Sequence, residues 1–143
     1  MIRHTDQKIL PYSQKQLYEL VADIECYPEF LPWCKKSVIQ QKQGDKLFAE
    51  LTIGYKFFQE SYLSEVILTP PTKISVQYAK GPLKHLKNQW TFKSLTEKSC
   101  QVNFELEFEL QSFFLQKMTE GLFTTIMHQM LNAFEVRAKQ LYS

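Results

Sequence analysis

Residues 101–110 (QVNFELEFEL) carry the most regular pattern in the chain. Apolar side chains occupy every second position from Val102 to Leu110, and polar or acidic side chains fill the positions between them. A period of two predicts an antiparallel strand with one buried and one solvated face. Weaker alternation predicts further strands at 47–53, 57–68 and 74–78 and around residues 90–92. Both alternations of 57–68 carry apolar residues, so its inward face stays open.

Helical periodicity appears in two places. Residues 13–22 (SQKQLYELVA) begin with a serine suited to cap a helix, and Leu17, Leu20 and Val21 recur at helical spacing. From about residue 112 to the end, the period of 3.6 returns. Apolar residues spaced by four then stand at Met118, Leu122, Ile126, Met130, Phe134 and Ala138. One helix of roughly 30 residues would span ~45 Å.

The order of these elements predicts an α+β domain covering residues 1–143. It runs from a short strand through one or two short helices and about six antiparallel strands to a long C-terminal helix. The broad apolar face of that helix must be buried against the apolar face of the sheet. We therefore expect a helix-grip fold, in which a curved sheet of about six to seven strands wraps around the long helix. Such an arrangement encloses an apolar cavity.

Composition and charge argue against some classes of protein and indicate a compartment. The chain is 44% hydrophobic and 14% aromatic, which is typical of a globular domain. Its formal net charge is only +2, and 15 of its 17 basic residues are lysine, which argues against a dedicated nucleic-acid reader. Three cysteines without framework spacing suit a reducing compartment. The chain has neither an apolar run long enough for a bilayer nor an N-terminal signal peptide, so the cytoplasm is expected.

The sequence contains no constellation typical of catalysis. His4, His85 and His128 have no cysteine or carboxylate partner at metal-binding spacing. Neither a Gly-x-Ser-x-Gly motif nor a phosphate-binding loop occurs, and the chain has four glycines in all. We therefore expect a protein that is not an enzyme and that requires no metal or other cofactor.

Residues 27–34 (YPEFLPWC) combine two prolines, three aromatic residues and a cysteine. Proline fixes its own φ and pushes the residue before it toward extended geometry, so this segment is neither a regular helix nor a strand throughout. Two interpretations stay open. Phe30, Leu31, Pro32 and Trp33 either form the mouth or wall of the cavity, or simply plug one end of the sheet.

Three segments carry a family resemblance. Residues 20–34 (LVADIECYPEFLPWC), residues 79–92 (AKGPLKHLKNQWTF) and, more weakly, residues 59–68 (QESYLSEVIL) resemble segments of the coenzyme Q-binding START-domain family. This family belongs to the polyketide cyclase/START-like superfamily and includes bacterial ribosome-association toxins. The resemblance implies the helix-grip fold and two alternative activities: binding of a ubiquinone-like lipid in support of respiration, or binding of the large ribosomal subunit to block subunit joining. A cyclase or aromatase activity is a third alternative.

The preferred hypothesis is a carrier of a prenyl-quinone lipid, because the predicted interior is aromatic and aliphatic. A carrier of this kind would contact the inner membrane peripherally while it exchanges its ligand. The residues expected to line the cavity are Phe30, Leu31, Pro32, Trp33, Trp90, Phe92, Phe104, Phe108, Met118, Leu122, Phe123, Ile126 and Met130. A basic rim that meets anionic lipid or RNA phosphates is expected at Lys35, Lys36, Lys80, Lys84 and Lys87.

Overall fold

The computed structural model describes residues 1–55, 58–112, 116–117 and 120–143. Within these residues, seven antiparallel strands form one sheet in the order β1-β7-β6-β5-β4-β3-β2. The strands are β1 (Ile2–Leu10), β2 (Cys34–Gln43), β3 (Lys46–Tyr55), β4 (Phe58–Thr69), β5 (Lys73–Lys80), β6 (Leu83–Thr96) and β7 (Ser99–Leu110). The helical elements are α1 (Gln14–Ala22), the 3₁₀ helix η1 (Ile24–Glu29) and α3 (Phe123–Tyr142).

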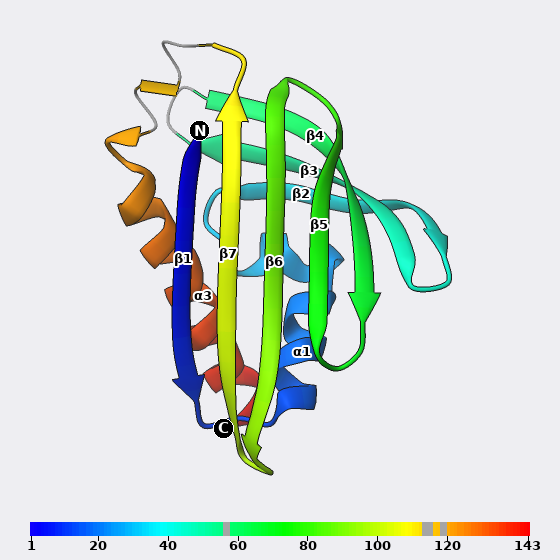
Figure 1. Cartoon of the computed structure of the whole chain (residues 1–143), viewed down its shortest axis with the longest axis vertical. Coiled ribbons are helices and arrows are strands. Elements are labelled where there is room, and N and C mark those ends of the chain that lie inside the picture. The colour runs from blue at the N-terminus through cyan, green and yellow to red at the C-terminus, as the bar shows by residue number, and fades with distance from the viewer. Residues whose placement is uncertain (56–57, 113–115, 118–119) are drawn as a thin grey trace.

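The sheet is strongly bent, and the helices lie on its concave side (Figure 1). Strands β1, β7 and β6 run along the long axis, whereas β2, β3 and β4 cross behind them, and α3 lies behind β1 and β7. The first strand of the chain pairs with the last, since Ile2 opposes Phe108 and Leu10 opposes Cys100. The predicted helix-grip fold is confirmed.

The alternation on β7 behaves as predicted. Val102 and Phe104 are buried, and they oppose Phe92 and Trp90 of β6. The structure also settles the orientation of β4, which is described from Phe58; Phe57 lies outside the described residues. Ser64 and Val66 are buried on the concave side, whereas Ile67 is 42% exposed.

Helix α1 begins at the predicted serine. Ser13 Oγ accepts a hydrogen bond from the backbone N–H of Gln16, and Gln16 Oε1 accepts one from the backbone N–H of Ser13. This capping box pairs two backbone donors that would otherwise lack a partner. Leu17, Leu20 and Val21 then point into the core, as their spacing predicts.

The long C-terminal helix is shorter than predicted. Residues 121–122 form a turn, and α3 begins only at Phe123 and runs for 20 residues. The apolar spacing continues through this turn, but glycine is unfavourable inside a helix, and Gly121 stands at the break. The prediction of one continuous helix from about residue 112 was therefore wrong.

Residues 27–34 pack against the core beside β2. Pro28 lies inside η1, which ends at Glu29, and the chain then turns into β2. The segment is fixed to the sheet edge because the N–H of Gly54 donates to the carbonyl of Trp33 at 2.8 Å. Leu31 and Trp33 are buried, whereas Pro32 is exposed.

Candidate functional site

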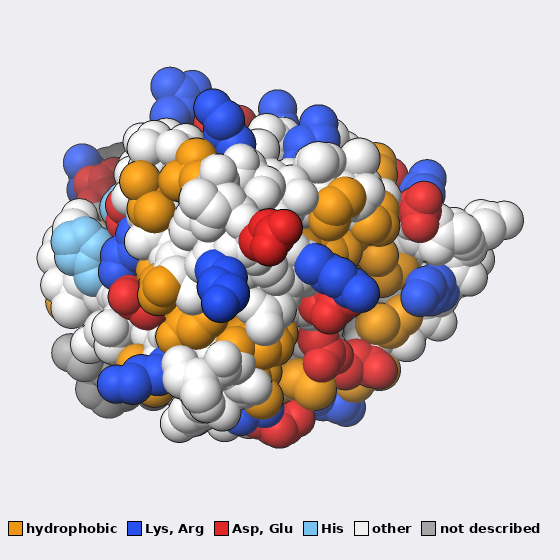
Figure 2. Space-filling model, turned by 90° about the horizontal axis from the view of Figure 1, so that it is seen from below, with side chains coloured by type: hydrophobic (Ala, Val, Ile, Leu, Met, Phe, Trp, Pro, Cys, Tyr) orange, Lys and Arg blue, Asp and Glu red, His pale blue; other side chains and the backbone are white. Residues whose placement is uncertain are grey.

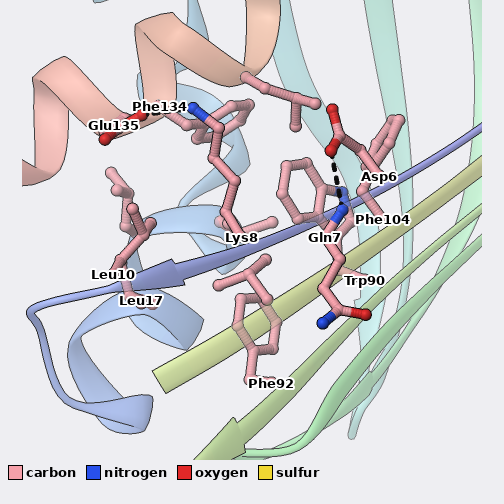
Figure 3. Close-up of a pocket in the computed structure, with 14 residues that line it drawn as sticks. Asp6, Gln7, Lys8, Leu10, Leu17, Trp90, Phe92, Phe104, Phe134 and Glu135 are labelled. Carbon is pink, nitrogen blue, oxygen red and sulfur yellow. Dashed lines mark hydrogen bonds and ion pairs between the residues drawn. The ribbon is translucent and has the colours of Figure 1, made fainter. Parts of the chain in front are cut away.

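A cavity of about 40 Å³ lies between α1, α3 and the strands β1, β6 and β7 (Figure 3). Most of the side chains around it are apolar and buried, and they come from elements far apart in the chain. These are Leu10, Leu17, Leu20, Val21, Trp90, Phe92, Val102, Phe104, Leu131 and Phe134. The interior therefore offers an aromatic and aliphatic environment without a charged group among its buried members.

The polar residues of the cavity lining are the ones that reach solvent. Besides Gln7 they are Asp6, Lys8 and Glu135, whose side chains are 28%, 44% and 40% exposed. Lys8 Nζ of β1 donates to Glu135 Oε2 of α3 at 2.6 Å, so an ion pair spans the two elements beside the cavity. The cavity thus has an apolar floor and a charged mouth at the seam between β1 and α3.

The cavity is small compared with the pockets in which proteins bind drug-sized ligands. Pockets that hold drug-sized ligands measure about 300–1,000 Å³, whereas a single water needs only about 10–15 Å³. A volume of about 40 Å³ accommodates a few waters and no lipid. A larger apolar ligand therefore needs a wider space than this cavity provides.

An aromatic cluster holds α3 over this interior. The ring of Phe134 lies 5.0 Å from that of Trp90, 5.5 Å from Tyr27 and 5.1 Å from Phe30, each in an edge-to-face arrangement. On the same side of α3, Arg137 Nη2 donates to Glu29 Oε1 at 3.0 Å, and its guanidinium lies 5.3 Å from the ring centre of Phe30. Residues 27–30 therefore act as an anchor for the helix.

Of the residues predicted to contact a ligand, Trp90, Phe92 and Phe104 line this cavity. Phe30 and Leu31 pack in the core beside it, and Trp33 is buried at the sheet edge. Pro32 is exposed and Leu122 is 36% exposed, so neither faces the interior. Leu122 points outward because it precedes the first turn of α3.

A second aromatic contact lies near the beginning of α3. The rings of Phe108 and Phe123 are 5.0 Å apart, and Phe123 also packs edge-on against His4 at 5.9 Å. Ile126 and Met130 follow along the same helix and are half-buried against the core. Met118 lies outside the described residues.

The concave face also carries hydroxyl groups that the sequence pattern did not reveal. Ser37 Oγ and Ser64 Oγ are buried, and among the described residues neither has a hydrogen-bond partner. Burial raises the pKa of the phenols of Tyr27 and Tyr62, and Tyr27 donates to the carbonyl of Val21. These groups stay protonated and serve as neutral donors. The alternation Tyr62-Ser64-Val66 was the available signal, but the inward face of β4 was ambiguous.

The cysteines are free thiols. Burial raises the pKa of Cys34 to about 11, and hydrogen bonds to the carboxylates of Asp23 and Glu29 raise that of Cys26 to about 12. Burial also raises the pKa of Cys100. A thiol is a nucleophile only as the thiolate, so these environments suppress reactivity.

The five lysines of the expected rim are all exposed: Lys35, Lys36, Lys80, Lys84 and Lys87. Lys36 opposes Thr52, Thr52 opposes Ser61, and a Cβ on Gly81 would lie 3.2 Å from the Ser61 carbonyl. Strands are ~4.8 Å apart, so three such steps place the segments at 35–36 and 80–81 about 15 Å apart at one end of the molecule. The opposite end, where the C-terminus lies, mixes both charge signs with hydrophobic patches (Figure 2).

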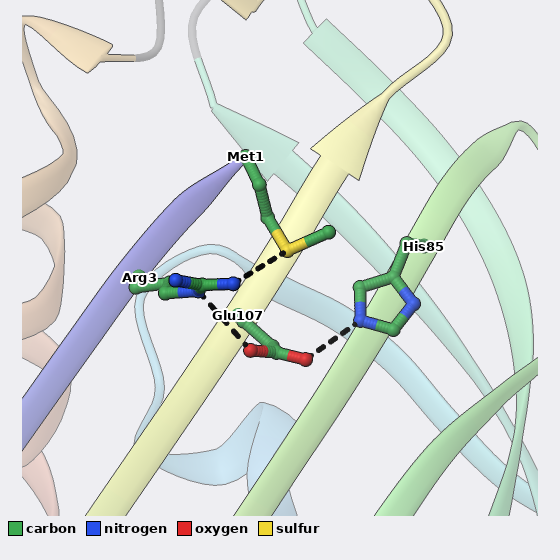
Figure 4. Close-up of polar contacts among 4 residues, drawn as sticks. All are labelled: Met1, Arg3, His85 and Glu107. Atoms are coloured by element: carbon green, nitrogen blue, oxygen red, sulfur yellow. Dashed lines mark hydrogen bonds and ion pairs between the residues drawn. The ribbon is translucent and has the colours of Figure 1, made fainter.

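Lys87 stands apart from this rim because it opposes Glu107 on the convex face of the sheet. Glu107 connects three strands there: its Oε2 lies 3.3 Å from Arg3 Nε and its Oε1 lies 3.0 Å from His85 Nε2, while Arg3 also approaches the Met1 sulfur (Figure 4). The hydrogen bond with His85 is the main cause that lowers the pKa of Glu107. Glu107 thus links β1, β7 and β6 on the convex face.

Comparison with solved structures agrees with this architecture. The crystal structure of the ZhuI aromatase/cyclase from Streptomyces sp. R1128 matches with a TM-score of 0.86 over 97% of this chain and 94% of that chain. The two sequences are 15% identical, so the likeness concerns the fold alone. Among the described helices, none combines the length and hydropathy needed to cross a membrane.

Two relatives match at higher identity. The ribosome association toxin RatA of Pseudomonas aeruginosa is 35% identical over 134 residues, which cover 94% of this chain and 93% of that protein. The coenzyme Q-binding protein COQ10 homolog B, mitochondrial, of Xenopus laevis is 30% identical over 145 residues, covering 99% of this chain and 59% of that protein. The family model described as polyketide cyclase/dehydrase and lipid transport matches residues 10–135. This chain belongs to that family.

Proposed function

We propose that the protein binds a prenyl-quinone-type lipid between α3 and the concave face of the sheet, and carries it without chemical turnover. The observation that carries the proposal is the apolar cavity at this position, with Trp90, Phe92 and Phe134 in its wall. Aromatic side chains can stack on a quinone ring, and burial of an isoprenoid tail contributes ~0.8 kcal/mol per CH₂. The name of the Xenopus relative agrees with this ligand class.

The inward hydroxyls support a neutral ligand with hydrogen-bond acceptors. Burial raises the pKa of Tyr62, so its phenol remains a donor at neutral pH. Ser37 and Ser64 add two buried hydroxyls without a partner in the described part of the chain. Like Tyr62, they lie on the concave face at β2 and β4, outside the lining of the cavity, so a ligand reaches them only when it extends beyond the cavity. An apolar site with a few polar groups is typical of ligand pockets, in which the polar groups orient the ligand. A quinone carbonyl is an acceptor of the required kind.

The two tryptophans allow a direct test. We would extract freshly purified protein with organic solvent, identify lipids by mass spectrometry, and titrate delipidated protein with a short-tailed ubiquinone. In a Trp33→Phe variant the remaining Trp90 lines the cavity, and we expect strong quenching of its fluorescence. The matched Trp90→Phe variant retains Trp33, outside the cavity lining, and should be quenched less. Absence of lipid together with absence of quenching would refute the proposal.

The second candidate function is association with the large ribosomal subunit. The name of the Pseudomonas relative, which matches over 94% of this chain, favours it. The exposed lysines at 35–36 and 80–84 would supply contacts to RNA phosphates, and such contacts weaken steeply with salt. We expect Lys35, Lys36, Lys80 and Lys84 changed together to Glu to abolish co-sedimentation with large subunits.

The control for this test is a charge change at the other end of the molecule. Lys93 and Lys98 are exposed near the β6–β7 turn, and their replacement by Glu should leave co-sedimentation intact. This control changes the formal charge by −4, so it is compared with Lys80→Glu combined with Lys84→Glu, which changes it by the same amount. Equal loss in these two variants would indicate binding through net charge alone. The same lysine rim could contact anionic membrane lipids at ~1 kcal/mol per Lys, which a carrier needs for exchange at the inner membrane.

A further inference from the structure

We infer that lipid enters through the seam between β1 and α3, and that the charges at this seam select ligands with uncharged head groups. The inference rests on the proposed lipid binding and adds the access route and the head-group class.

The exposed fractions of the lining side chains show where the cavity opens to solvent. The apolar members of the cavity lining are each at most 9% exposed, whereas the side chains of Lys8 and Glu135 are 44% and 40% exposed. Figure 3 shows Lys8 extending from β1 toward Glu135 on α3, across the apolar side chains. Solvent therefore meets the cavity at this seam.

The attachment of α3 is unequal on its two sides. β1 is an edge strand, so the sheet's hydrogen-bond ladder does not cross this seam. In the described part of the chain, one hydrogen bond joins β1 to α3, and it belongs to the Lys8–Glu135 ion pair. Nearer the beginning of α3, His4 of β1 also has ring contacts with Phe123 and His128 at 5.9 and 6.1 Å. Toward η1, α3 is held by the Arg137–Glu29 ion pair, by two ring contacts of Phe134 and by the guanidinium of Arg137 over the ring of Phe30. Beside the cavity, the exposed Lys8–Glu135 pair closes the β1 side, whereas the buried ring of Phe134 closes the η1 side, so the helix opens at the seam.

The charge at the mouth has a definite sign. Two carboxylates, Asp6 and Glu135, face one ammonium, Lys8, which leaves a net negative charge beside an apolar floor. Asp6 Oδ2 lies 3.7 Å from His4 Nε2, which is otherwise without a partner among the described residues. A carboxylate or phosphate head would meet like charge on a partly desolvated surface, which disfavours binding. The uncharged head of a quinone passes without this penalty.

The experiment uses Trp90 as a reporter that requires no lipid. In the full chain with Trp33→Phe, we would measure quenching of Trp90 by neutral acrylamide and by anionic iodide at constant ionic strength. We expect acrylamide to quench more efficiently than iodide. Lys8→Gln and Glu135→Gln both break the ion pair and should increase acrylamide quenching about two- to five-fold, in line with a partly exposed pair.

Lys8→Gln and Glu135→Gln change the charge of the mouth in opposite directions. Comparing them therefore separates the opening of the seam from its selection against anions. Lys8→Gln leaves both carboxylates, so iodide should stay excluded, whereas Glu135→Gln combined with Asp6→Asn should admit it. Glu29→Gln breaks the ion pair on the other side of α3 and serves as the matched control, with unchanged quenching. Circular dichroism would establish that each variant is folded.

Each outcome decides a separate point. If Glu29→Gln increases acrylamide quenching as much as Lys8→Gln, or if iodide is admitted equally in all variants, the inference is overturned. If Trp90 responds as expected but delipidated protein takes up no ubiquinone, the seam is an opening and the proposed function fails. If ubiquinone binds while Trp90 is indifferent to Lys8 and Glu135, the lipid uses another route and the inference fails alone.

Discussion

Phe134 is the side chain on which the closed interior depends most. Its side chain is 6% exposed and contacts Trp90 of the sheet as well as Tyr27 and Phe30 of the η1 segment. Phe134→Ala should therefore loosen α3 from both partners at once. Replacement of a buried phenylalanine by alanine costs about 3–5 kcal/mol in protein cores.

The structure places this variant in the middle of that range. Burial of the ring contributes about 1.5–3 kcal/mol relative to exposure, and each edge-to-face pair adds about 0.5–1.5 kcal/mol. The three pairs share one ring and are not independent, so their energies do not simply add. We expect a loss of about 4 kcal/mol, a large part of the ~5–15 kcal/mol that domains possess.

Urea unfolding followed by far-UV circular dichroism measures this loss. The matched control is Val136→Ala on the same helix, where the side chain is 46% exposed and the change should stay within ~0.5 kcal/mol. A loss below about 1 kcal/mol for Phe134→Ala would refute the view that the ring fastens α3. The variant also enlarges the cavity, so added ubiquinone should raise its Tm more than that of the wild type.

Three further predictions concern single groups. Gly81→Ala should destabilise by about 1–3 kcal/mol, because Gly81 has φ +145 and a Cβ would lie 2.9 Å from that of Tyr62. Gly44→Ala should cost less in the same urea titration, because no atom lies within 4 Å of its added Cβ. The pKa of Cys34 is raised from 9.0 to about 11, so the unfolded chain releases this proton first and the free energy of unfolding should fall between these pH values. Urea titrations at several pH values should show a smaller fall in Cys34→Ala; an equal fall would assign the effect to other groups. His85→Ala should raise the pKa of Glu107 toward its ordinary value in a carboxyl NMR titration, and an unchanged pKa would assign the shift to other neighbours.

The fold could be predicted where one physical demand dominates the pattern. β7 separates a buried from a solvated face, so its alternation is complete, and α1 is fixed by a serine cap followed by an apolar stripe. The first residue of α3 was predicted wrongly because the pattern there does not reveal the physical cause of the break. The same apolar spacing continues across residues 121–122, and the turn there depends on how the chain leaves β7.

The candidate site was predictable only for its aromatic wall. Trp90, Phe92 and Phe104 stand on strands with clear alternation, so their inward direction follows from the pattern. The charged mouth could not be foreseen, because Asp6 and Lys8 on β1 face inward although their residue types indicate solvent. They are tolerated there because an edge strand leaves the inward face close to solvent at the seam.

The closed cavity has a consequence for which lipids can bind. Opening α3 at the β1 seam separates Phe134 from Trp90 and so gives up part of the packing energy of about 4 kcal/mol, whereas a tail regains ~0.8 kcal/mol per buried CH₂. Up to about five carbons, roughly one isoprene unit, are therefore needed before binding is favourable at all. A tailless benzoquinone should not bind, and affinity should rise with each added isoprene unit until the tail exceeds the space under the sheet. Equal affinity for tailless and prenylated quinones, measured by quenching of Trp90, would place the ligand on the surface and leave α3 closed.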